Sequence, residues 1–453
     1  MAKKIIICLL FVVFLFPVFM DRVVLAVPDC LHITPESSEV DKSYCRGELA
    51  AIEAELVKLL DLQKAQKKQT GTLIGDVNYL NSQINALRAK IQARSLVIAQ
   101  LKVNITEKTN TINSLSQKIA REHESLAKLL RNTHEFDNEN IVYLVLSDAS
   151  LSNFYNDLES YASIKQAVQD SVDVIKGAKT QTEIAKQDLE KKQNAETDAK
   201  VELENAQRKV AVSEAEKKKL LSISKDTEVA YQKLAAEKKA RADKIRAALF
   251  PLRDAGAIPF GTALMYAENA EKITGVRPAF VLAILQQESN MGANVGSCVI
   301  ANLMTGETRG VNSGTIFPNG IHPTRDLPLL QTIVTELGRN PLITRVSCPI
   351  GSGYGGAMGP TQFIPSTWNG MKSRVAAALN KTTPDPWNPQ DAIMASSLYL
   401  KELGANAGGY TAERTAALKY YAGGNWSKPS NAFYGDQVMG RVTAIQANID
   451  LLQ

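Results

Sequence analysis

The sequence predicts a mainly α-helical protein in which a long antiparallel coiled-coil hairpin precedes a globular helical domain. Its 453 residues exceed what one hydrophobic core usually organises. Residues 36–250 contain no proline and four glycines, whereas residues 251–453 hold 23 of the 27 glycines, 14 of the 17 prolines and all three tryptophans. The first composition is typical of long helices and the second of a loop-rich domain, so one large globule is excluded.

Residues 1–26 have the pattern of a secretory signal peptide. Lys3 and Lys4 precede an apolar run from Ile5 to Met20, and small or medium residues lead to a cleavage site after Ala26. An uncleaved membrane anchor is the alternative, although this run is shorter than the roughly 20 residues that span a bilayer. The residues before Cys30 lack the small residue that precedes a lipidated cysteine. We therefore expect an exported protein of the periplasm, the cell wall or the extracellular space.

The charge of the chain excludes one class of partner. The formal net charge is +5, and it falls to +3 without residues 1–26, which contain three basic residues and one acidic residue. Such a weak charge argues against a nucleic-acid partner. The four histidines show no metal-ligand spacing, so neither a metal nor a cofactor is expected.

Four cysteines remain after the signal segment, two in each region of the chain. In an oxidising compartment the economical pairing joins Cys30 to Cys45, within residues 27–48, and Cys298 to Cys348. A Cys/His nucleophile that uses His322 is the alternative for the second pair, and no motif around these cysteines supports it.

An apolar register with steps of three and four residues runs from Leu49 to Leu129. It pauses after Leu59, resumes at Leu73 and continues through a long series of leucines and isoleucines. So narrow an apolar stripe is buried only against another helix, which indicates a coiled coil. A helix of this length would reach about 120 Å.

A second helical run, from about Tyr161 to Ile245, follows a break at residues 132–140. Its seam is smaller and more polar, with Ala178, Ala185, Ala199 and Ala206 in register. Two helices joined by a compact tip most simply form an antiparallel hairpin, here over residues 49–249. The weaker second seam leaves room for opening or for a third helix.

The tip, residues 132–161, has more apolar residues than a turn needs. They either pack on one another or form a docking surface for a partner. Residues 45–245 resemble the coiled-coil region of EnvC-type and PcsB-type murein hydrolase regulators, which have a leucine-rich short-helix tip. This resemblance implies control of wall-cleaving activity at a membrane or cell-division complex. The zinc peptidase-like or Cys/His domain that usually follows there has no counterpart in this sequence.

Residues 250–453 alternate helical patterns with glycine-rich loops. The expected helices span residues 261–273, 278–290, 327–337, 365–379, 389–403, 413–421 and 434–452. In the second of these, Val281, Ile284 and Leu285 form an apolar stripe, and Glu288 continues it near the helix end. A carboxyl on this face loses hydration, so its pKa should rise toward the range of a general acid. The alternative is a structural glutamate that pairs with an arginine or caps a neighbouring segment.

Four motifs carry a second resemblance. Residues 283–292 (AILQQESNMG) resemble the Glu-Ser motif of lysozyme-like lytic transglycosylases, and residues 356–368 (GAMGPTQFIPSTW) resemble a motif of the membrane-bound lytic transglycosylase B type. Residues 388–393 (NPQDAI) fit that family's next helix. Residues 420–423 (YYAG) resemble the Tyr-Asn-Ala-Gly motif of the wider superfamily, with Tyr421 in place of the asparagine. The motifs occur in family order, and together they imply a lysozyme-like domain.

The resemblance implies roles for individual residues. Glu288 matches the family's catalytic acid/base, and Ser289 is its neighbour in the motif. Substrate binding is implied for Ser289 and for the matching residues of the later motifs, which are Met358, Gly359, Gln362, Phe363 and Tyr420. Glycines could let backbone amides approach a sugar, Gln362 could bind an acetamido group, and aromatic faces could stack on sugar rings. Phe363 and Trp368 could equally be core residues, and Tyr420 a packed tyrosine.

The implied reaction cleaves the β-1,4 bond between N-acetylmuramic acid and N-acetylglucosamine in peptidoglycan glycan strands and yields 1,6-anhydro products. A hydrolase would normally need a second carboxylate, for which Asp326, Asp385 and Asp391 are the candidates. Capping is the expected role of Asp391. Residues 293–354, bracketed by Cys298 and Cys348, form an insertion that either shapes the glycan site or is structural.

We therefore expect an exported peptidoglycan lytic transglycosylase that its coiled coil positions or restrains. The alternatives are a hydrolytic muramidase and a non-catalytic wall-binding regulator that works through the coiled coil.

Overall fold

The computed structural model describes residues 28–69, 72–137, 151–222 and 257–452, with a few single positions between 232 and 240. The expected signal segment, residues 1–26, and the middle of the expected tip lie outside the described residues. No helix in these ranges is both long and apolar enough to cross a membrane.

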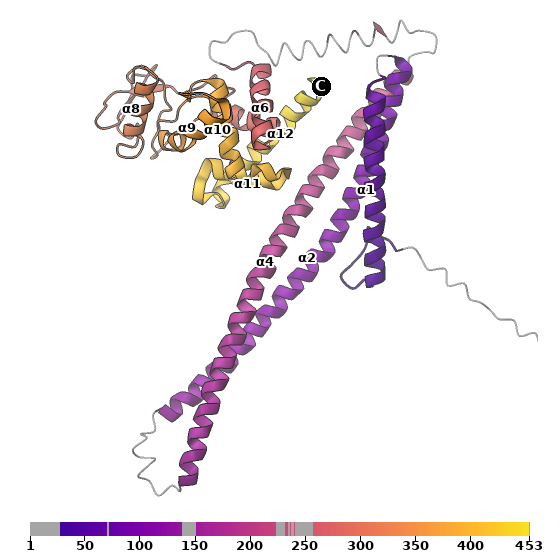
Figure 1. Ribbon diagram of the computed structural model, residues 1–453, viewed down its shortest axis with the longest axis vertical. Coiled ribbons are helices and arrows are strands. Elements are labelled where there is room, and N and C mark those ends of the chain that lie inside the picture. Colours follow the sequence, from indigo (N-terminus) through magenta and orange to yellow (C-terminus); the bar gives the residue numbers. More distant parts are fainter. Residues whose placement is uncertain are drawn as a thin grey trace, which may run out of the picture.

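The N-terminal region consists of helices α1 (Glu39–Lys67), α2 (Leu73–Asp137) and α4 (Leu151–Leu221). Helices α2 and α4 lie side by side along most of their length (Figure 1). Ion pairs join Arg88 to Glu214 at 2.6 Å and Lys108 to Asp188 at 3.0 Å, so residue numbers rise along α2 as they fall along α4. The antiparallel hairpin predicted from the sequence is confirmed.

The hairpin seam has the uneven composition that the sequence indicates. Leu80, Ile84 and Ile98 of α2 are buried, and α4 contributes alanines to the seam. The buried alanines of α4 are Ala178, Ala185, Ala199 and Ala206. Small side chains bury little apolar area, so α4 contributes less to the stability of the pair than α2 does.

The prediction of one helix from Leu49 to Leu129 is wrong, because the chain reverses between α1 and α2. Helix α1 folds back and packs against α2 at the end of the hairpin remote from the tip (Figure 1). The pause in the apolar register after Leu59 coincides with this reversal. The Thr72 hydroxyl accepts a hydrogen bond from the Gly75 amide at 3.0 Å, which is a helix N-cap. Helix α2 has 65 residues and is therefore about 98 Å long, shorter than expected.

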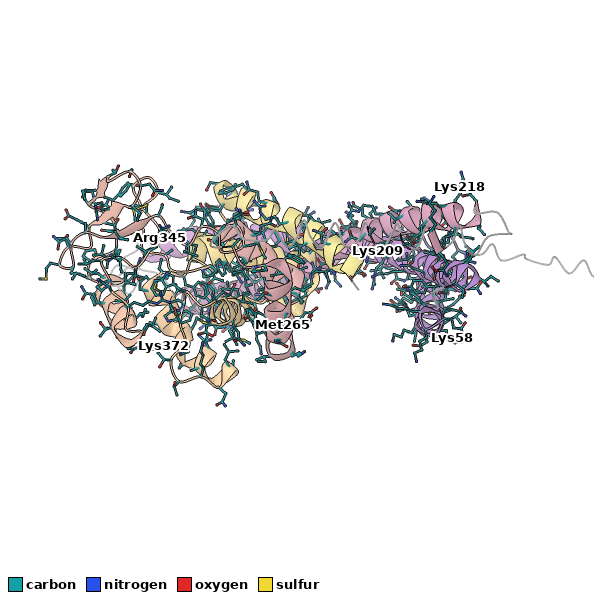
Figure 2. All side chains as sticks on the ribbon, turned by 90° about the horizontal axis from the view of Figure 1, so that it is seen from above. Lys58, Lys209, Lys218, Met265, Arg345 and Lys372 are labelled. Carbon is teal, nitrogen blue, oxygen red and sulfur yellow. A yellow bond between two sulfur atoms is a disulfide. The ribbon has the colours of Figure 1, made fainter. Side chains whose placement is uncertain are left out.

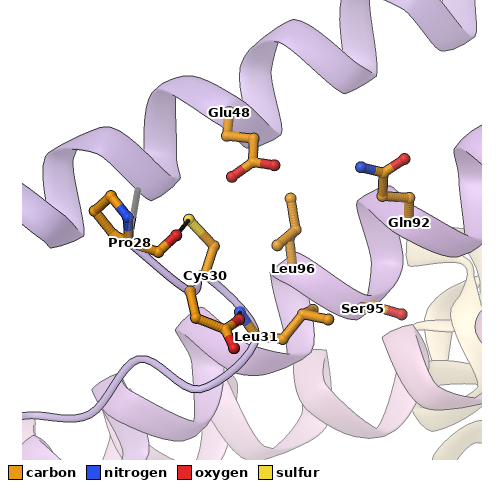
Figure 3. Close-up of a pocket in the computed structure, with 8 residues that line it drawn as sticks. Pro28, Cys30, Leu31, Glu48, Gln92, Ser95 and Leu96 are labelled. Atoms are coloured by element: carbon orange, nitrogen blue, oxygen red, sulfur yellow. Dashed lines mark hydrogen bonds between the residues drawn. The ribbon is translucent and has the colours of Figure 1, made fainter. Parts of the chain in front are cut away.

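A disulfide between Cys30 and Cys45 fastens the segment before α1 to that helix, as predicted. Both cysteines are buried in a small cluster with Ile52 of α1 and with Ala93 and Leu96 of α2. A hollow of about 290 Å³ opens beside them (Figure 3). Its lining belongs to the N-terminal segment, α1 and α2, so the hollow is a feature of the coiled coil.

The C-terminal domain contains the helices that the sequence predicts, with ends shifted by a few residues. They are α6 (Phe260–Thr274), α7 (Pro278–Ser289), α8 (Leu327–Glu336), α9 (Pro365–Leu379), α10 (Pro389–Glu402), α11 (Gly409–Ala422) and α12 (Ala432–Leu452). Helix α7 is central: residues 279–285 are all buried, and α6, α10 and α12 pack around it. A second core, around Trp368, lies between α8, α9 and α10.

The insertion, residues 293–354, contains α8 and a small antiparallel sheet. The sheet has the order β1 (Cys298–Ile300), β2 (Thr308–Gly310) and β3 (Ile316–Phe317). The predicted disulfide between Cys298 and Cys348 closes this segment at its base. Helix α8 packs on α9, so the insertion is joined to the rest of the domain by a shared core as well as by the disulfide.

The two regions touch where α4 passes α11. The Asp198 carboxylate accepts a hydrogen bond from the Thr411 amide at 2.7 Å, in the first turn of α11. Nearer the C-terminal end of α4, Lys209 pairs with Asp450 of α12 at 2.6 Å. Figure 2 shows Lys209 where the coiled coil meets the C-terminal domain. A Cβ atom on Gly409 would lie 2.9 Å from an Asp198 oxygen, so a glycine permits the close approach.

Candidate active site

Glu288 lies in the last turn of α7, where the chain leaves the buried centre of the domain. Three consecutive residues with positive φ end the helix, namely Asn290, Met291 and Gly292. The Ser289 hydroxyl accepts the Gly292 amide at 2.8 Å and donates to the Leu285 carbonyl at 3.2 Å. This sharp turn leaves Glu288 partly exposed at the edge of a rigid helix.

The carboxyl of Glu288 is held by the hydroxyl of Tyr434, which donates a hydrogen bond to Oε1. Burial by surrounding protein raises the pKa of Glu288 from 4.5 to about 7, and the Tyr434 hydrogen bond opposes part of this rise. Among the described residues, no arginine or lysine contributes to this pKa. Glu288 is therefore neither free in solvent nor a partner of an arginine, and both of its protonation states are accessible near neutral pH.

Tyr434 is the site residue that the sequence reasoning missed. It lies in the first turn of α12, is 3% exposed, and stacks its ring on Tyr421 at 4.6 Å between centroids. Burial and the charge of Glu288 raise the pKa of Tyr434 well above 10, so the phenol stays neutral and can donate. Only the packing of α12 against α7 brings Tyr434 near Glu288. The one sequence feature that could have drawn attention to Tyr434 was its position at the start of an expected helix.

A polar contact fixes α12 beside the end of α7. The Gln287 side-chain oxygen accepts a hydrogen bond from Arg441 at 2.7 Å, and its amide nitrogen donates to Gln437 at 3.1 Å. Gln287 precedes Glu288, so these bonds hold the backbone at the carboxyl in a fixed relation to Tyr434.

The segment 356–368 forms a tight loop that leads into α9. The Met358 amide bonds to the Phe363 carbonyl at 2.9 Å, and Gln362 has a positive φ of 52° and donates to the Gly359 carbonyl at 2.8 Å. A Cβ on Gly359 would lie 1.9 Å from the Pro386 carbonyl oxygen, so this glycine is required for backbone packing.

Burial divides the sequence-predicted binding residues into two groups. Ser289, Met358 and Phe363 are at most 3% exposed, whereas Gln362 and Tyr420 are partly exposed. Trp368 is completely buried. The structure thus places the first three inside the domain, behind the surface at which a substrate could arrive.

Tyr420, near the end of α11, connects this loop to Glu288. Its hydroxyl donates to the Thr361 carbonyl at 2.7 Å, and its ring packs 5.6 Å from the ring of Phe363. Burial and the charge of Glu288 raise its pKa well above 10. Tyr420 therefore remains a neutral phenol whose surroundings include the Glu288 carboxyl.

The three candidates for a second carboxylate have structural partners. The cation pairs are Asp326 with Arg325, Asp385 with Arg339, and Asp391 with Lys381. Asp326 also accepts the Ser366 amide at 3.0 Å, and the fully buried Asp391 accepts the Asp385 amide at 2.8 Å. These contacts fasten loops to helices, so none of the three groups is free to act with Glu288.

A helical domain in which burial raises the pKa of Glu288 to about 7, at the end of a buried helix, has the acid/base group that a glycan-cleaving enzyme needs. Residues 253–438 match the family model described as the transglycosylase SLT domain, which is less than half of the chain. Residues 253–438 of the C-terminal region are therefore a transglycosylase SLT domain.

Solved structures give weaker likenesses. A 36 kDa muramidase/transglycosylase has 14% identity and a TM-score of 0.31, with 53% of this chain and 89% of that one covered. The Escherichia coli lytic transglycosylase Slt35 in complex with bulgecin A also has 14% identity, with a TM-score of 0.30 and coverage of 52% and 89%. The family match over residues 253–438 identifies the domain. A comparison with curated proteins gave no match.

Proposed function

We propose that this domain cleaves the β-1,4 bond between N-acetylmuramic acid and N-acetylglucosamine with Glu288 as both acid and base. Protonated Glu288 gives its proton to the departing glycosidic oxygen. The carboxylate then takes the proton of the muramoyl C6 hydroxyl, and that oxygen bonds to C1 to close a 1,6-anhydro ring. No water is consumed, and Glu288 ends the cycle protonated.

The observation that carries this proposal is the pKa of about 7 of the Glu288 carboxyl. An acid/base group works best when its pKa lies near the working pH, because both forms are then populated. Hydrolysis would normally use a second carboxylate about 5 to 9.5 Å away. The ion pairs of Asp326, Asp385 and Asp391 therefore favour the anhydro product over the hydrolytic one.

The remaining motif residues divide into substrate contacts and supports. Gln362 and Tyr420 are partly exposed, and we assign them to sugar binding, whereas buried Gly359 packs its backbone on Pro386. Buried Met358 and Phe363 hold the loop through their backbone pair, and Ser289 holds the turn after Glu288. These three residues would act on the substrate through the neighbours that they position.

The test uses purified glycan strands with the unmutated chain and with Glu288→Gln. Mass spectrometry should find anhydromuramoyl ends from the unmutated chain and none from the variant. A muramidase would give reducing ends that are heavier by one water. Folded protein that yields no anhydro ends would refute the proposed reaction.

We also propose that the coiled coil controls the enzyme through the contact between α4 and α11. Asp198 lies against the first turn of α11, and the last turns of the same helix carry Tyr420. A shift of α4 could therefore be transmitted along a rigid helix to the site. Asp198→Ala should change the rate of glycan cleavage, whereas Asp173→Ala, at an exposed position elsewhere on α4, should not. Equal rates in both variants would contradict this coupling.

Export and a partner at the tip complete the proposal. Two disulfides in the described residues support an oxidising location. We assign the protein to the cell envelope, where its glycan substrate lies, and the tip at residues 132–161 to a membrane or division complex. Cell fractionation that found the mature chain in the cytosol with reduced cysteines would exclude this location.

A further inference from the structure

Three aromatic side chains gather beside Glu288 on the side formed by α11 and α12. Tyr421 is the penultimate residue of α11, and Phe433 and Tyr434 lie in the first turn of α12. The rings of Tyr421 and Tyr434 stack at 4.6 Å with an interplanar angle of 13°, and Phe433 meets Tyr421 edge-on at 5.6 Å. The loop between the two helices thus returns the chain so that these rings adjoin.

The three rings differ in their exposure. Tyr434 is 3% exposed and points its hydroxyl at Glu288, whereas Tyr421 is 50% exposed and Phe433 is 47% exposed. By contrast, Phe363, whose ring lies 5.6 Å from that of Tyr420, is buried. The Tyr421 ring covers Tyr434 with only one of its two faces. The exposed parts of Tyr421 and Phe433 therefore leave an apolar, aromatic surface that no described part of the chain covers.

We infer that Tyr421 and Phe433 form a sugar-binding subsite next to Glu288, which takes one pyranose ring of a glycan strand. The C–H face of a pyranose is apolar and flat, and it matches the exposed face of an aromatic ring, while the Tyr421 hydroxyl can bond to a sugar hydroxyl or acetamido group. The position of the rings indicates that the occupant is the glycan itself. Tyr421 stacks on Tyr434, and Tyr434 bonds to the carboxyl at which the glycan is cut. This subsite rests on the proposed function for the identity of its glycan.

Tyr421 is the residue at which this chain departs from the related motif. Tyr421 stands where the motif that residues 420–423 resemble has asparagine, a small amide that offers no ring face. A tyrosine adds stacking area at the edge of the site, so this enzyme should hold its strand more tightly at this point than an asparagine would allow.

The test measures binding apart from cleavage. The full chain with Glu288→Gln is titrated calorimetrically with purified glycan strands that lack stem peptides, alone and combined with Tyr421→Ala, Tyr421→Phe or Phe433→Ala. Tyr44→Ala is the matched control, because Tyr44 is 44% exposed on the coiled coil. Tyr421→Ala should weaken binding about tenfold and Phe433→Ala several-fold. Tyr421→Phe, which keeps the ring and loses the hydroxyl, should weaken binding less than Tyr421→Ala, and Tyr44→Ala should leave it unchanged.

Several outcomes would overturn the subsite. One is unchanged affinity in both alanine variants with native tryptophan fluorescence, and another is absence of any binding by the Glu288→Gln chain. A shifted pH profile of cleavage with unchanged affinity in Tyr421→Ala would make Tyr421 a support for Tyr434 instead. If binding falls as expected but the unmutated chain forms no anhydro ends, the subsite stands and the proposed reaction fails.

Discussion

Replacement of Glu288 by glutamine should stabilise the C-terminal domain at alkaline pH. The folded state raises the pKa of this carboxyl from 4.5 to about 7, so the folded protein holds a proton that the unfolded chain releases. The stability of the unmutated domain therefore falls as the pH rises from about 4.5 to 7, and it becomes level once both states are ionised. Each pKa unit corresponds to about 1.4 kcal/mol, so the ionised carboxyl costs about 3 kcal/mol of folding free energy.

Glutamine removes this cost and keeps the hydrogen bond, because its side-chain oxygen can accept from Tyr434. The difference in unfolding free energy between Glu288→Gln and the unmutated chain should thus grow by about 3 kcal/mol between pH 4 and pH 8. Urea denaturation followed by tryptophan fluorescence is a suitable assay, since all three tryptophans lie in this domain and the coiled coil contributes no signal.

A matched control separates the site from the general effect of charge. Glu307→Gln makes the same substitution at a partly exposed position in the insertion, and it is the reference with which the Glu288→Gln difference is compared. If the Glu288→Gln difference is flat from pH 4 to pH 8, the carboxyl has an ordinary pKa and the argument for an acid/base at this position fails.

Other perturbations have equally definite outcomes. Tyr434→Phe removes a hydrogen bond that lowers the pKa of Glu288, so the alkaline limb of the pH profile of glycan cleavage should move to higher pH; a shift to lower pH would contradict the geometry. Replacing Cys298 and Cys348 with serine opens a bridge with a sequence separation of 50 and should cost about 4 kcal/mol of unfolding free energy, measured by urea denaturation. Asp198→Ala removes a carboxylate cap from the first turn of α11 and should cost about 1 kcal/mol there, visible as faster amide exchange in that turn alone; unchanged exchange would show that α4 does not hold the helix.

Local patterns explain why most of the helices and both disulfides were predictable. Helix α7 begins at Pro278, whose fixed φ suits a first turn, and ends at a left-handed Asn290, so its bounds follow from neighbours in sequence. The position of Glu288 on its partly buried face follows from the 3.6-residue period. The cysteine pairing followed from two cysteines in each of two separate regions.

The misjudged features depend on contacts between distant residues. The reversal between α1 and α2 was missed because a coiled-coil register continues across a turn as readily as along one helix. Only the packing of α1 on Ala93 and Leu96 of α2 distinguishes two helices from one continuous helix. Met358 was expected to bind substrate and the burial of Phe363 was left open, because a motif gives residue types and not the depth at which a loop lies.

Periodicity, helix-end signals and composition act within a few residues, so they were sufficient to predict most of the helices, the cysteine pairs and the carboxyl at the end of a buried helix. Three contacts became visible in the folded chain alone: Tyr434 bonds to Glu288, Tyr421 and Phe433 adjoin that pair, and Asp198 meets α11. These partners lie tens to hundreds of residues apart, and the burial that sets the pKa of Glu288 is a sum over all the helices that pack around it.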